Sequence, residues 1–365
     1  GDEIEACKRI MEIYGEKLDE LADDKVSEIL INGPDHIYIE RGGTLQETPA
    51  KFASEAQLKA AAVNIAKSVE RQLDEMHPDL DARLPDGSRV HATIPPISRS
   101  GTIISIRKFK KDMLTIDKLE DYGSIPHDGV LLLNAIVKLR KNTIVSGGTS
   151  SGKTSLLNAL SGLIPENDRI LVLEDASELQ LQQKHTVYFE TRKPDKNGNG
   201  AFSIRDLVIA SLRLRPDRLV IGEIRGGEAF DLLQAMNTGH SGSMSTIHAN
   251  SAVDALRRME ACAMMSGIEL PLAAVRMQVA SAINCVVQTS HMPDGSRKTV
   301  EIAEVTPPEN GEYRMRTLMK WETESAFPDP EKPGHMVIKG RFILGEAPTF
   351  RHEAEIMGLE LPKYE

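Results

Sequence analysis

Residues 146–155 read Ser146-Gly147-Gly148-Thr149-Ser150-Ser151-Gly152-Lys153-Thr154-Ser155. An apolar run at residues 142–145 precedes them, and a helical pattern at residues 156–160 follows. This strand, loop and helix order, with the full GxxxxGKT spacing, is typical of a phosphate-binding loop (P-loop). A glycine-rich turn that binds nothing is the alternative interpretation, and the agreement of all three elements disfavours it. The sequence therefore predicts that residues 147–155 bind a nucleoside triphosphate.

Each part of such a loop has a physical task. Glycines let the backbone turn its N–H groups inward around a polyphosphate, and the start of the following helix adds a field that favours an anion. Lys153 can reach the β- and γ-phosphates. The Thr154 hydroxyl is placed for a magnesium ion. We therefore expect Mg²⁺ to accompany the nucleotide.

Length and charge narrow the class of protein. The chain has 365 residues, and single hydrophobic cores stop growing at roughly 250–300 residues, so two domains or more are expected. The formal net charge of −10 makes the whole chain a poor partner for DNA. A local basic face remains compatible with this balance, but direct nucleic-acid binding is not expected.

Cysteine usage and hydropathy indicate a cytosolic setting. Cys7, Cys262 and Cys285 are scattered without CxxC pairs, so neither a disulfide framework nor a zinc site is predicted. No transmembrane segment is predicted, because no apolar stretch approaches the roughly 18–20 residues of a membrane span, and no signal-peptide pattern opens the chain. Membrane association is therefore expected to go through partners. Because the sequence begins at Gly1 without an initiator Met, we expect that the protein has further residues upstream of it.

Residues 1–110 are predicted to form a small α+β domain, and residues 111–126 a polar linker. Helical periodicity covers residues 4–22 and 54–71, with Ser54 as N-cap of the second helix. Strands are expected at residues 27–31, 36–40, 81–84, 89–94 and 102–107.

Residues 127–305 alternate between helical and strand patterns. Near-continuous apolar runs at residues 170–173, 218–221 and 244–247 indicate buried strands of a mainly parallel sheet. The fold class is therefore α/β. After residue 305, proline, glycine and charge become frequent, and residues 306–365 are predicted as a small C-terminal appendage.

Two strands of this sheet end in acids. The apolar run 170–173 is followed by Glu174 and Asp175, and the run 218–221 is followed by Glu223. The carboxyl edge of a parallel sheet is where α/β proteins bind ligands, and phosphoryl transfer needs a carboxylate to orient water and acids beside the metal. The alternative interpretation is an ordinary surface acid at a strand end.

Histidines and arginines supply further candidates. His240 and His248 lie before and after a short predicted strand, next to glycines. They are interpreted either as polar sensors of phosphate state or as structural histidines. Arg83, Arg89 and Arg107 lie on predicted strands of the first domain and their turns. They are either solvated surface or, if that domain folds over its own or a neighbouring subunit's nucleotide, the source of an arginine finger.

Four segments of the chain, taken in order, resemble the motifs of a known protein superfamily. Residues 146–155, 173–175, 213–229 and 236–250 resemble the Walker A, Asp box, Walker B and His box of the type II/type IV secretion ATPase superfamily. Residues 81–90, 234–240 and 245–251 look most like its CpaF/TadA branch, which assembles tight-adherence (Flp) pili. The resemblance runs from about residue 25 to the end of the chain.

The resemblance implies a homo-hexameric ATPase ring at the cytoplasmic face of the inner membrane. ATP would lie between the small N-terminal domain and a RecA-like domain. Rearrangement of the ring would push or rotate an inner-membrane platform protein so that pilin subunits are extracted.

The resemblance also implies roles for individual residues. Lys153 and Thr154 would hold the phosphates and Mg²⁺, Glu174 is the preferred water-activating base, and Glu223 would act on the metal side; these last two assignments can be exchanged. His240 and His248 would couple the γ-phosphate to the subunit interface. Arg107, with Arg83 and Arg89, would supply positive charge from the N-terminal domain.

The leading hypothesis is an ATP-hydrolysing motor for pilus assembly or secretion. A conjugative DNA-transfer ATPase of the same superfamily shares the ring and the motifs. A nucleic-acid translocase would show DNA-stimulated hydrolysis, which the acidic balance disfavours. A nucleotide switch that does not hydrolyse ATP is disfavoured because Glu174 and Glu223 are both present.

Overall fold

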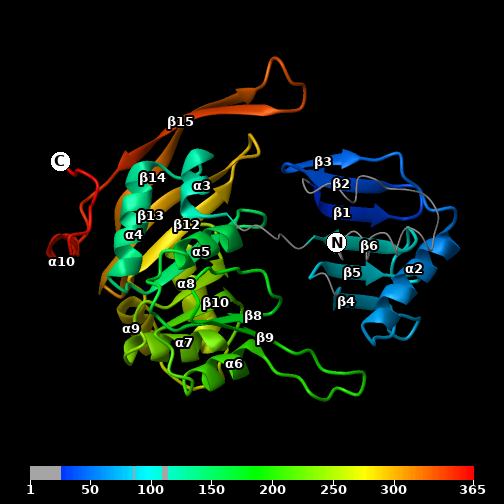
Figure 1. The fold of residues 1–365 in the computed structure, drawn as a ribbon, viewed down its shortest axis with the longest axis horizontal. Helices are drawn as coiled ribbons and strands as arrows, with labels where there is room; N and C mark the ends of the chain where they lie inside the picture. Colours follow the sequence, from blue (N-terminus) through cyan, green and yellow to red (C-terminus); the bar gives the residue numbers. More distant parts are fainter. Residues whose placement is uncertain (1–25, 85–86, 109–113) are drawn as a thin grey trace. The chain divides into compact units, whose positions relative to one another are not determined.

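The computed structural model describes residues 26–84, 87–108 and 114–365 of the chain (Figure 1). The chain divides into two compact units. The first comprises Gly1–Lys111 and Lys193–Ala201, and the second comprises Asp112–Arg192 and Phe202–Glu365. The helix predicted at residues 4–22 and Cys7 lie outside the described residues.

An antiparallel sheet forms the first unit, with strand order β3-β2-β1-β6-β5-β4. Its strands are β1 (Val26–Asn32), β2 (Ile37–Arg41), β3 (Thr44–Glu47), β4 (Asp79–Arg83), β5 (Arg89–Thr93) and β6 (Ile103–Arg107). Helix α2 (Glu55–Ser68) packs against it. The predicted cap is confirmed, because the Ser54 side chain accepts a hydrogen bond from the Gln57 N–H.

Strands β1, β2, β5 and β6 bury alternate residues on one side. On β1, Ile29 and Ile31 are buried, and on β6 Ile104 and Ile106 are buried. Because side chains alternate across a strand, these residues share one face of the sheet. That face contacts the apolar side of α2 through Leu58, Ala61, Ala62 and Ile65.

A larger sheet forms the second unit, with strand order β15-β14-β13-β12-β7-β11-β10-β8-β9. The parallel strands are β7 (Thr143–Gly147), β8 (Ile170–Glu174), β9 (Thr186–Glu190), β10 (Arg218–Ile224), β11 (Met244–His248) and β12 (Cys285–His291). The antiparallel continuation is β13 (Arg297–Glu309), β14 (Glu312–Pro328) and β15 (Met336–Leu344). The predicted α/β class with a small α+β domain and a mainly parallel sheet is confirmed.

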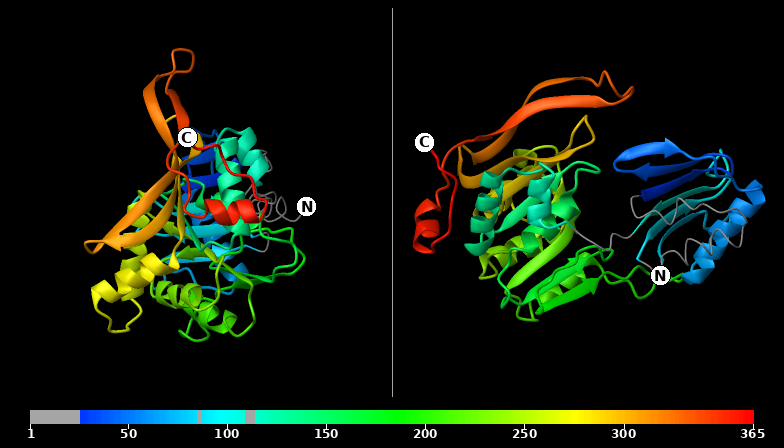
Figure 2. Two further views of the ribbon diagram at one scale, coloured as in Figure 1. Left: turned by 90° about the vertical axis from the view of Figure 1, so that its left-hand side faces the viewer. Right: turned by 45° about the horizontal axis from the view of Figure 1, so that its top comes forward.

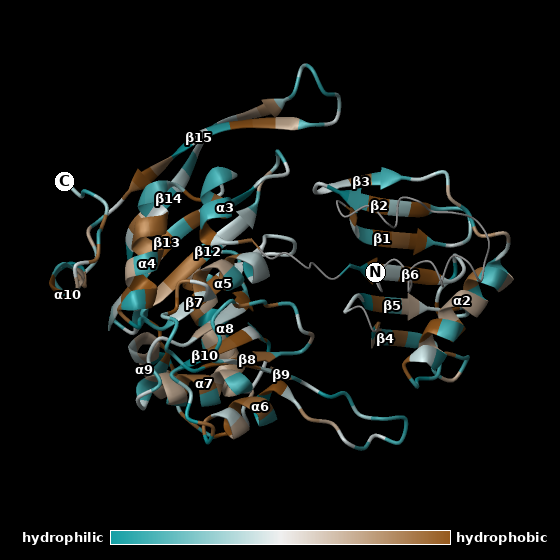
Figure 3. Cartoon of the chain, viewed as in Figure 1, coloured by the Kyte–Doolittle hydropathy of each residue, from teal (hydrophilic) through white to brown (hydrophobic). Residues whose placement is uncertain are grey.

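Helices cover both faces of this sheet (Figures 1 and 2). They are α3 (Ile116–Asp121), α4 (His127–Lys138), α5 (Lys153–Ser161), α6 (Ile204–Ser211), α7 (Glu228–Asn237), α8 (Ala252–Met264), α9 (Leu272–Ala282) and α10 (Arg351–Ile356). Neighbouring strand residues enter different cores: Val145 packs with α4 and α5, whereas Ile144 packs with α7 and α8. Apolar residues are therefore needed at consecutive positions, and the central strands are largely brown in Figure 3.

Two segments differ from their sequence-based description. Within residues 111–126, α3 is a helix whose Ile116 and Leu119 are buried in the core of the second unit. Within residues 306–365, β14 and β15 extend the large sheet, and Phe350 is buried in the same core. Pro328, Pro330 and Pro333 lie at the far end of the β14–β15 ribbon, which projects from the rest of the sheet (Figure 2).

A buried arginine at the amino end of β10 binds residues that precede β7 and β8. Arg218, which begins β10, is 1% exposed. Its Nε donates to Asp168 Oδ2 at 2.9 Å, and its Nη1 donates to the Val137 carbonyl at 3.0 Å. Breaking such a buried pair is costly, because it leaves an uncompensated charge.

We expect Asp168→Ala to lower the free energy of unfolding by about 3 kcal/mol, because the Arg218 guanidinium would stay buried without its counter-ion. Denaturant unfolding followed by circular dichroism measures this loss. Glu355→Ala is the matched control, because its pair with Arg351 is exposed and long at 3.8 Å. Equal stability of the two variants would contradict the assignment.

Candidate nucleotide-binding site

The glycine-rich loop joins β7 to α5 at the middle of the large sheet. β7 lies between β11 and β12 and ends at Gly147, and α5 begins at Lys153. A Cβ on Gly147 would lie 2.7 Å from the Thr289 carbonyl oxygen, so this position has no room for a side chain. Ser150 (φ 57°) and Gly152 (φ 88°) are left-handed. Such turns direct successive backbone N–H groups to one side, as an anion site requires.

The side chains of the loop agree with binding of an anion. The Oγ atoms of Ser146 and Ser151 are buried and have no hydrogen-bond partner among the described residues. Buried hydroxyls are normally hydrogen-bonded, and phosphate oxygens are acceptors that would satisfy them. Gly148 and Thr149 lie in the turn of the loop, and Thr154 and Ser155 lie in the first turn of α5.

Lys153 is held at the mouth of the loop by an acid. Its side chain is 14% exposed, and its Nζ lies 3.8 Å from Glu223 Oε1. Burial lowers the pKa of Lys153, and the Glu223 carboxylate opposes that shift. The structure therefore brings together the lysine and one of the two predicted acids.

Glu223 is also bound by an arginine that sequence reasoning missed. Arg225 donates to Glu223 Oε2 from Nε at 3.0 Å and from Nη2 at 2.7 Å. Its Nη1 lies 3.9 Å from Asp175 Oδ2 at the end of the neighbouring strand. Its sequence signal was its place in the segment 213–229, two residues after Glu223. Lys153, Glu223, Arg225 and Asp175 thus form a chain of alternating charge along the carboxyl edge.

Glu174 has a different environment. It is the last residue of β8 and is 3% exposed. Its Oε2 accepts hydrogen bonds from the N–H groups of Glu178 (2.9 Å) and Leu179 (3.1 Å). Burial outweighs these bonds and raises the pKa of Glu174 to about 7. A carboxyl group with this pKa exchanges protons near neutral pH.

The two histidines lie at opposite ends of β11. His248 ends the strand and is the Cα partner of Gly147, so it is beside the loop. His240 precedes the strand, at the amino edge of the sheet, and its buried Nδ1 has no hydrogen-bond partner among the described residues. The structure brings His248 to the loop and does not bring His240 there.

The three arginines of the first unit form a row. Arg83 on β4 is the Cα partner of Arg89 on β5, and Arg89 is the partner of Arg107 on β6. Directly opposed residues share a face, so the three cations are neighbours. Arg107 donates from Nε to Glu28 Oε1 at 3.1 Å. Like charges placed opposite one another are destabilising, and the carboxylates of Glu28 beside Arg107 and Asp81 near Arg89 lessen this repulsion.

The residues at the loop fit a magnesium ion. No group of three or more His, Cys, Asp or Glu side chains that could hold an ion by itself occurs within residues 26–84, 87–108 and 114–365. Magnesium does not need one, because it is usually bound by one or two protein oxygens together with substrate phosphates. Thr154 and Glu223 supply oxygens of the required kind.

A second residue that sequence reasoning missed contacts the loop from β13. Arg297 donates from Nε to the Ser150 carbonyl at 2.9 Å. On the adjacent β12, Thr289 Oγ1 donates to the Ser151 carbonyl at 3.0 Å. No spacing rule links these positions to the loop, since they lie more than a hundred residues away in the sequence.

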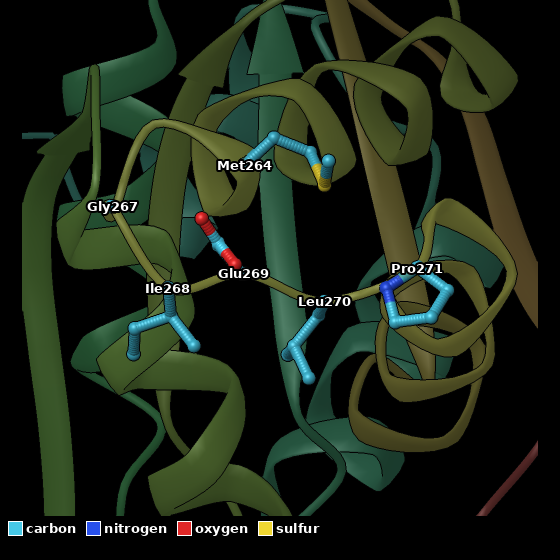
Figure 4. A pocket seen from close by; sticks show the side chains of 6 residues that line it. All are labelled: Met264, Gly267, Ile268, Glu269, Leu270 and Pro271. Carbon is cyan, nitrogen blue, oxygen red and sulfur yellow. The ribbon is translucent and has the colours of Figure 1, made fainter.

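A surface groove lies at the connection between α8 and α9 (Figure 4). Its lining is mostly apolar and contains none of the predicted site residues; it consists of Met264, Gly267, Ile268, Glu269, Leu270 and Pro271. In the part of the chain that the structure describes, no helix is long and apolar enough to span a bilayer.

Comparison with known proteins extends these observations. The family model of the type II/IV secretion system protein matches residues 15–308. A putative conjugal transfer protein of Mycobacterium tuberculosis is 32% identical over 327 residues, which cover 88% of this chain and 92% of that protein. The type IV secretion system protein PtlH of Bordetella pertussis is 34% identical over 307 residues, which cover 77% of this chain and 90% of PtlH.

Solved structures share the fold. The ATPase DotB of Legionella pneumophila has a TM-score of 0.56 at 20% identity, over 79% of each chain. The pilus retraction motor PilT with bound ADP has a TM-score of 0.51 at 18% identity, over 94% of this chain and 88% of PilT. The family match covers most of the chain, and the relatives are aligned over most of their own length. The chain therefore belongs to the family of type II/IV secretion system proteins.

Proposed function

We propose that this chain is an ATP-hydrolysing motor that powers pilus assembly or secretion. The observation that carries the proposal is the pairing of Lys153 with Glu223 at the mouth of a loop with GxxxxGKT spacing. The family match supports it, as does the similar fold of DotB, which is named as an ATPase. The substrate is ATP, and the products are ADP and phosphate.

Binding and charge stabilisation are the tasks of the loop. The N–H groups of residues 148–154 and the Lys153 ammonium surround the β- and γ-phosphates, where negative charge is spread in the transition state. Thr154 and Glu223 would hold Mg²⁺, which supplies neutralisation of charge on the phosphate oxygens when bound. Arg225 orients the Glu223 carboxylate beside Lys153.

Glu174 is the residue that takes a proton from the attacking water. A general base works best when its pKa lies near the operating pH, and burial brings the pKa of Glu174 to about 7. Both backbone hydrogen bonds go to Oε2, so Oε1 is the oxygen that accepts the proton. Glu223 instead contacts Lys153 at the mouth of the loop, which supports its role on the metal side.

Force is produced in a homo-hexamer that acts on an inner-membrane platform protein from the cytoplasmic side. Arg107, with Arg83 and Arg89, supplies positive charge to the γ-phosphate from the first unit of the same or a neighbouring subunit; their row on adjacent strands supports this role. His248 at the loop and His240 at the other end of β11 link the nucleotide to the subunit interface.

The more specific assignment is the CpaF/TadA branch, which builds tight-adherence pili. Residues 81–90, 234–240 and 245–251 support it. A conjugative DNA-transfer ATPase is the second candidate, favoured by the name of the relative from Mycobacterium tuberculosis, which is 32% identical over 88% of this chain.

Purified protein should hydrolyse ATP, and Lys153→Ala and Glu223→Ala should each lower kcat by about 10²–10³-fold. The first removes positive charge at the reacting phosphates, and the second removes an oxygen that would hold Mg²⁺. A phosphate-release assay measures this loss. Lys320→Ala is the control, since Lys320 is an exposed lysine on β14. Undiminished ATP turnover in both Lys153→Ala and Glu223→Ala would contradict the proposal.

The pH dependence tests Glu174. Because the base must be ionised, kcat should rise with pH and level off above about 7, and Glu174→Gln should abolish turnover. The folded protein favours the protonated acid, so its stability falls as pH rises from 4.5 to about 7. Glu174→Gln should therefore be more stable than the wild type at pH 8, by up to about 3 kcal/mol, and no more stable at pH 4. A pH-independent kcat would exclude Glu174 as the base.

The two cellular roles are separated in the organism that carries the gene. Chromosomal Lys153→Ala should abolish surface pili and leave plasmid transfer unchanged, because the motor drives pilin extraction. Electron microscopy of cells and mating assays give the two readouts, with Lys320→Ala as control. Lost plasmid transfer with intact pili would instead establish the conjugative function.

A further inference from the structure

The hairpin between β12 and β13 makes a contact with the phosphate loop that the function above does not use. Arg297, the first residue of β13, donates from Nε to the Ser150 carbonyl at 2.9 Å. Its side chain also lies over Gly152, because a Cβ on Gly152 would be 2.9 Å from Arg297 Cδ. Arg297 thus touches the part of the loop where the backbone turns into α5.

Ser150 needs such support because of its backbone conformation. Its φ of 57° is left-handed, which is unfavourable for a residue with a side chain. Without support, the backbone at Ser150 would favour a right-handed or extended conformation. The bond from Arg297 has a charged donor, and bonds of this kind are stronger than those between neutral groups. It therefore stabilises the conformation in which the neighbouring N–H groups can face an anion.

The hairpin itself is well placed to hold Arg297. His291 at the end of β12 is the Cα partner of Arg297. The turn is closed by a hydrogen bond from Met292 N–H to the Ser296 carbonyl at 2.7 Å. Thr289, on the same strand as His291, donates to the Ser151 carbonyl. Two consecutive loop carbonyls are thus bound by neighbouring strands.

We propose that Arg297 is a positioning residue for the phosphate loop. It acts through the Ser150 carbonyl, which it holds so that the backbone from Ser150 to Gly152 keeps its left-handed turns. Its positive charge beside the loop also favours a bound polyphosphate. The identity of that ligand as ATP rests on the proposed function, whereas the effect of Arg297 on the loop does not.

Steady-state kinetics separate positioning from chemistry. Arg297→Ala should raise the KM for ATP about tenfold and change kcat by less than about twofold, because a charge-assisted bond that shapes the binding loop is lost. Arg316→Ala is the matched control, since Arg316 donates to the Ala347 carbonyl at 2.8 Å from β14. It should leave KM unchanged.

A second substitution tests the cause. Glycine adopts left-handed conformations without steric cost, so Ser150→Gly should restore most of the affinity lost in Arg297→Ala. If Arg297 only stabilised the fold, Ser150→Gly would not correct its loss. Additive effects of the two substitutions on KM would therefore overturn the inference.

Hydrogen exchange in the nucleotide-free protein gives a readout that does not depend on hydrolysis. Amides of residues 148–154 should exchange faster in Arg297→Ala than in the wild type or in Arg316→Ala. If these amides exchange at the same rate in Arg297→Ala and in the wild type, the inference is wrong, whether or not the protein hydrolyses ATP. An unchanged KM for ATP in an active Arg297→Ala enzyme would also overturn it. If the wild type does not hydrolyse ATP, the proposed function is wrong, and hydrogen exchange still decides the role of Arg297.

Discussion

The conformation of the loop between β7 and α5 is the feature on which the rest of this protein depends. It requires that Gly147 has no side chain and that Ser150 and Gly152 are left-handed. β7 lies in the interior of a nine-stranded sheet, so the loop is supported from both sides. A rigid support of this kind lets a flexible, glycine-rich segment keep one conformation.

Charge at the carboxyl edge is divided between two environments. Glu223 contacts the cations Lys153 and Arg225, whereas Glu174 is buried with a pKa near 7. Two carboxyl groups in different surroundings can perform different tasks in one reaction. This difference supports the proposed roles of base and metal-side acid, which the motifs alone left exchangeable.

Sequence patterns predicted those strands, helices and loops whose conformation depends on residues close together in the sequence. The central strands were visible as apolar runs because helices cover both faces of the sheet, and the loop was visible because its GxxxxGKT spacing is typical of phosphate-binding loops. In α3, the two buried residues Ile116 and Leu119 are too few to stand out from a polar segment. His240 and His248 look equivalent in sequence, yet the length of β11 separates them. Arg297 reaches Ser150 only through tertiary structure, so no spacing could predict it.

Electron cryo-microscopy of the full chain with saturating, nonhydrolysable ATP analogue and Mg²⁺ tests the central claim most directly. The account predicts triphosphate density enclosed by the N–H groups of residues 148–154 and Lys153, in a closed ring of six chains. An empty loop at saturating analogue, in particles that remain single chains, would contradict it.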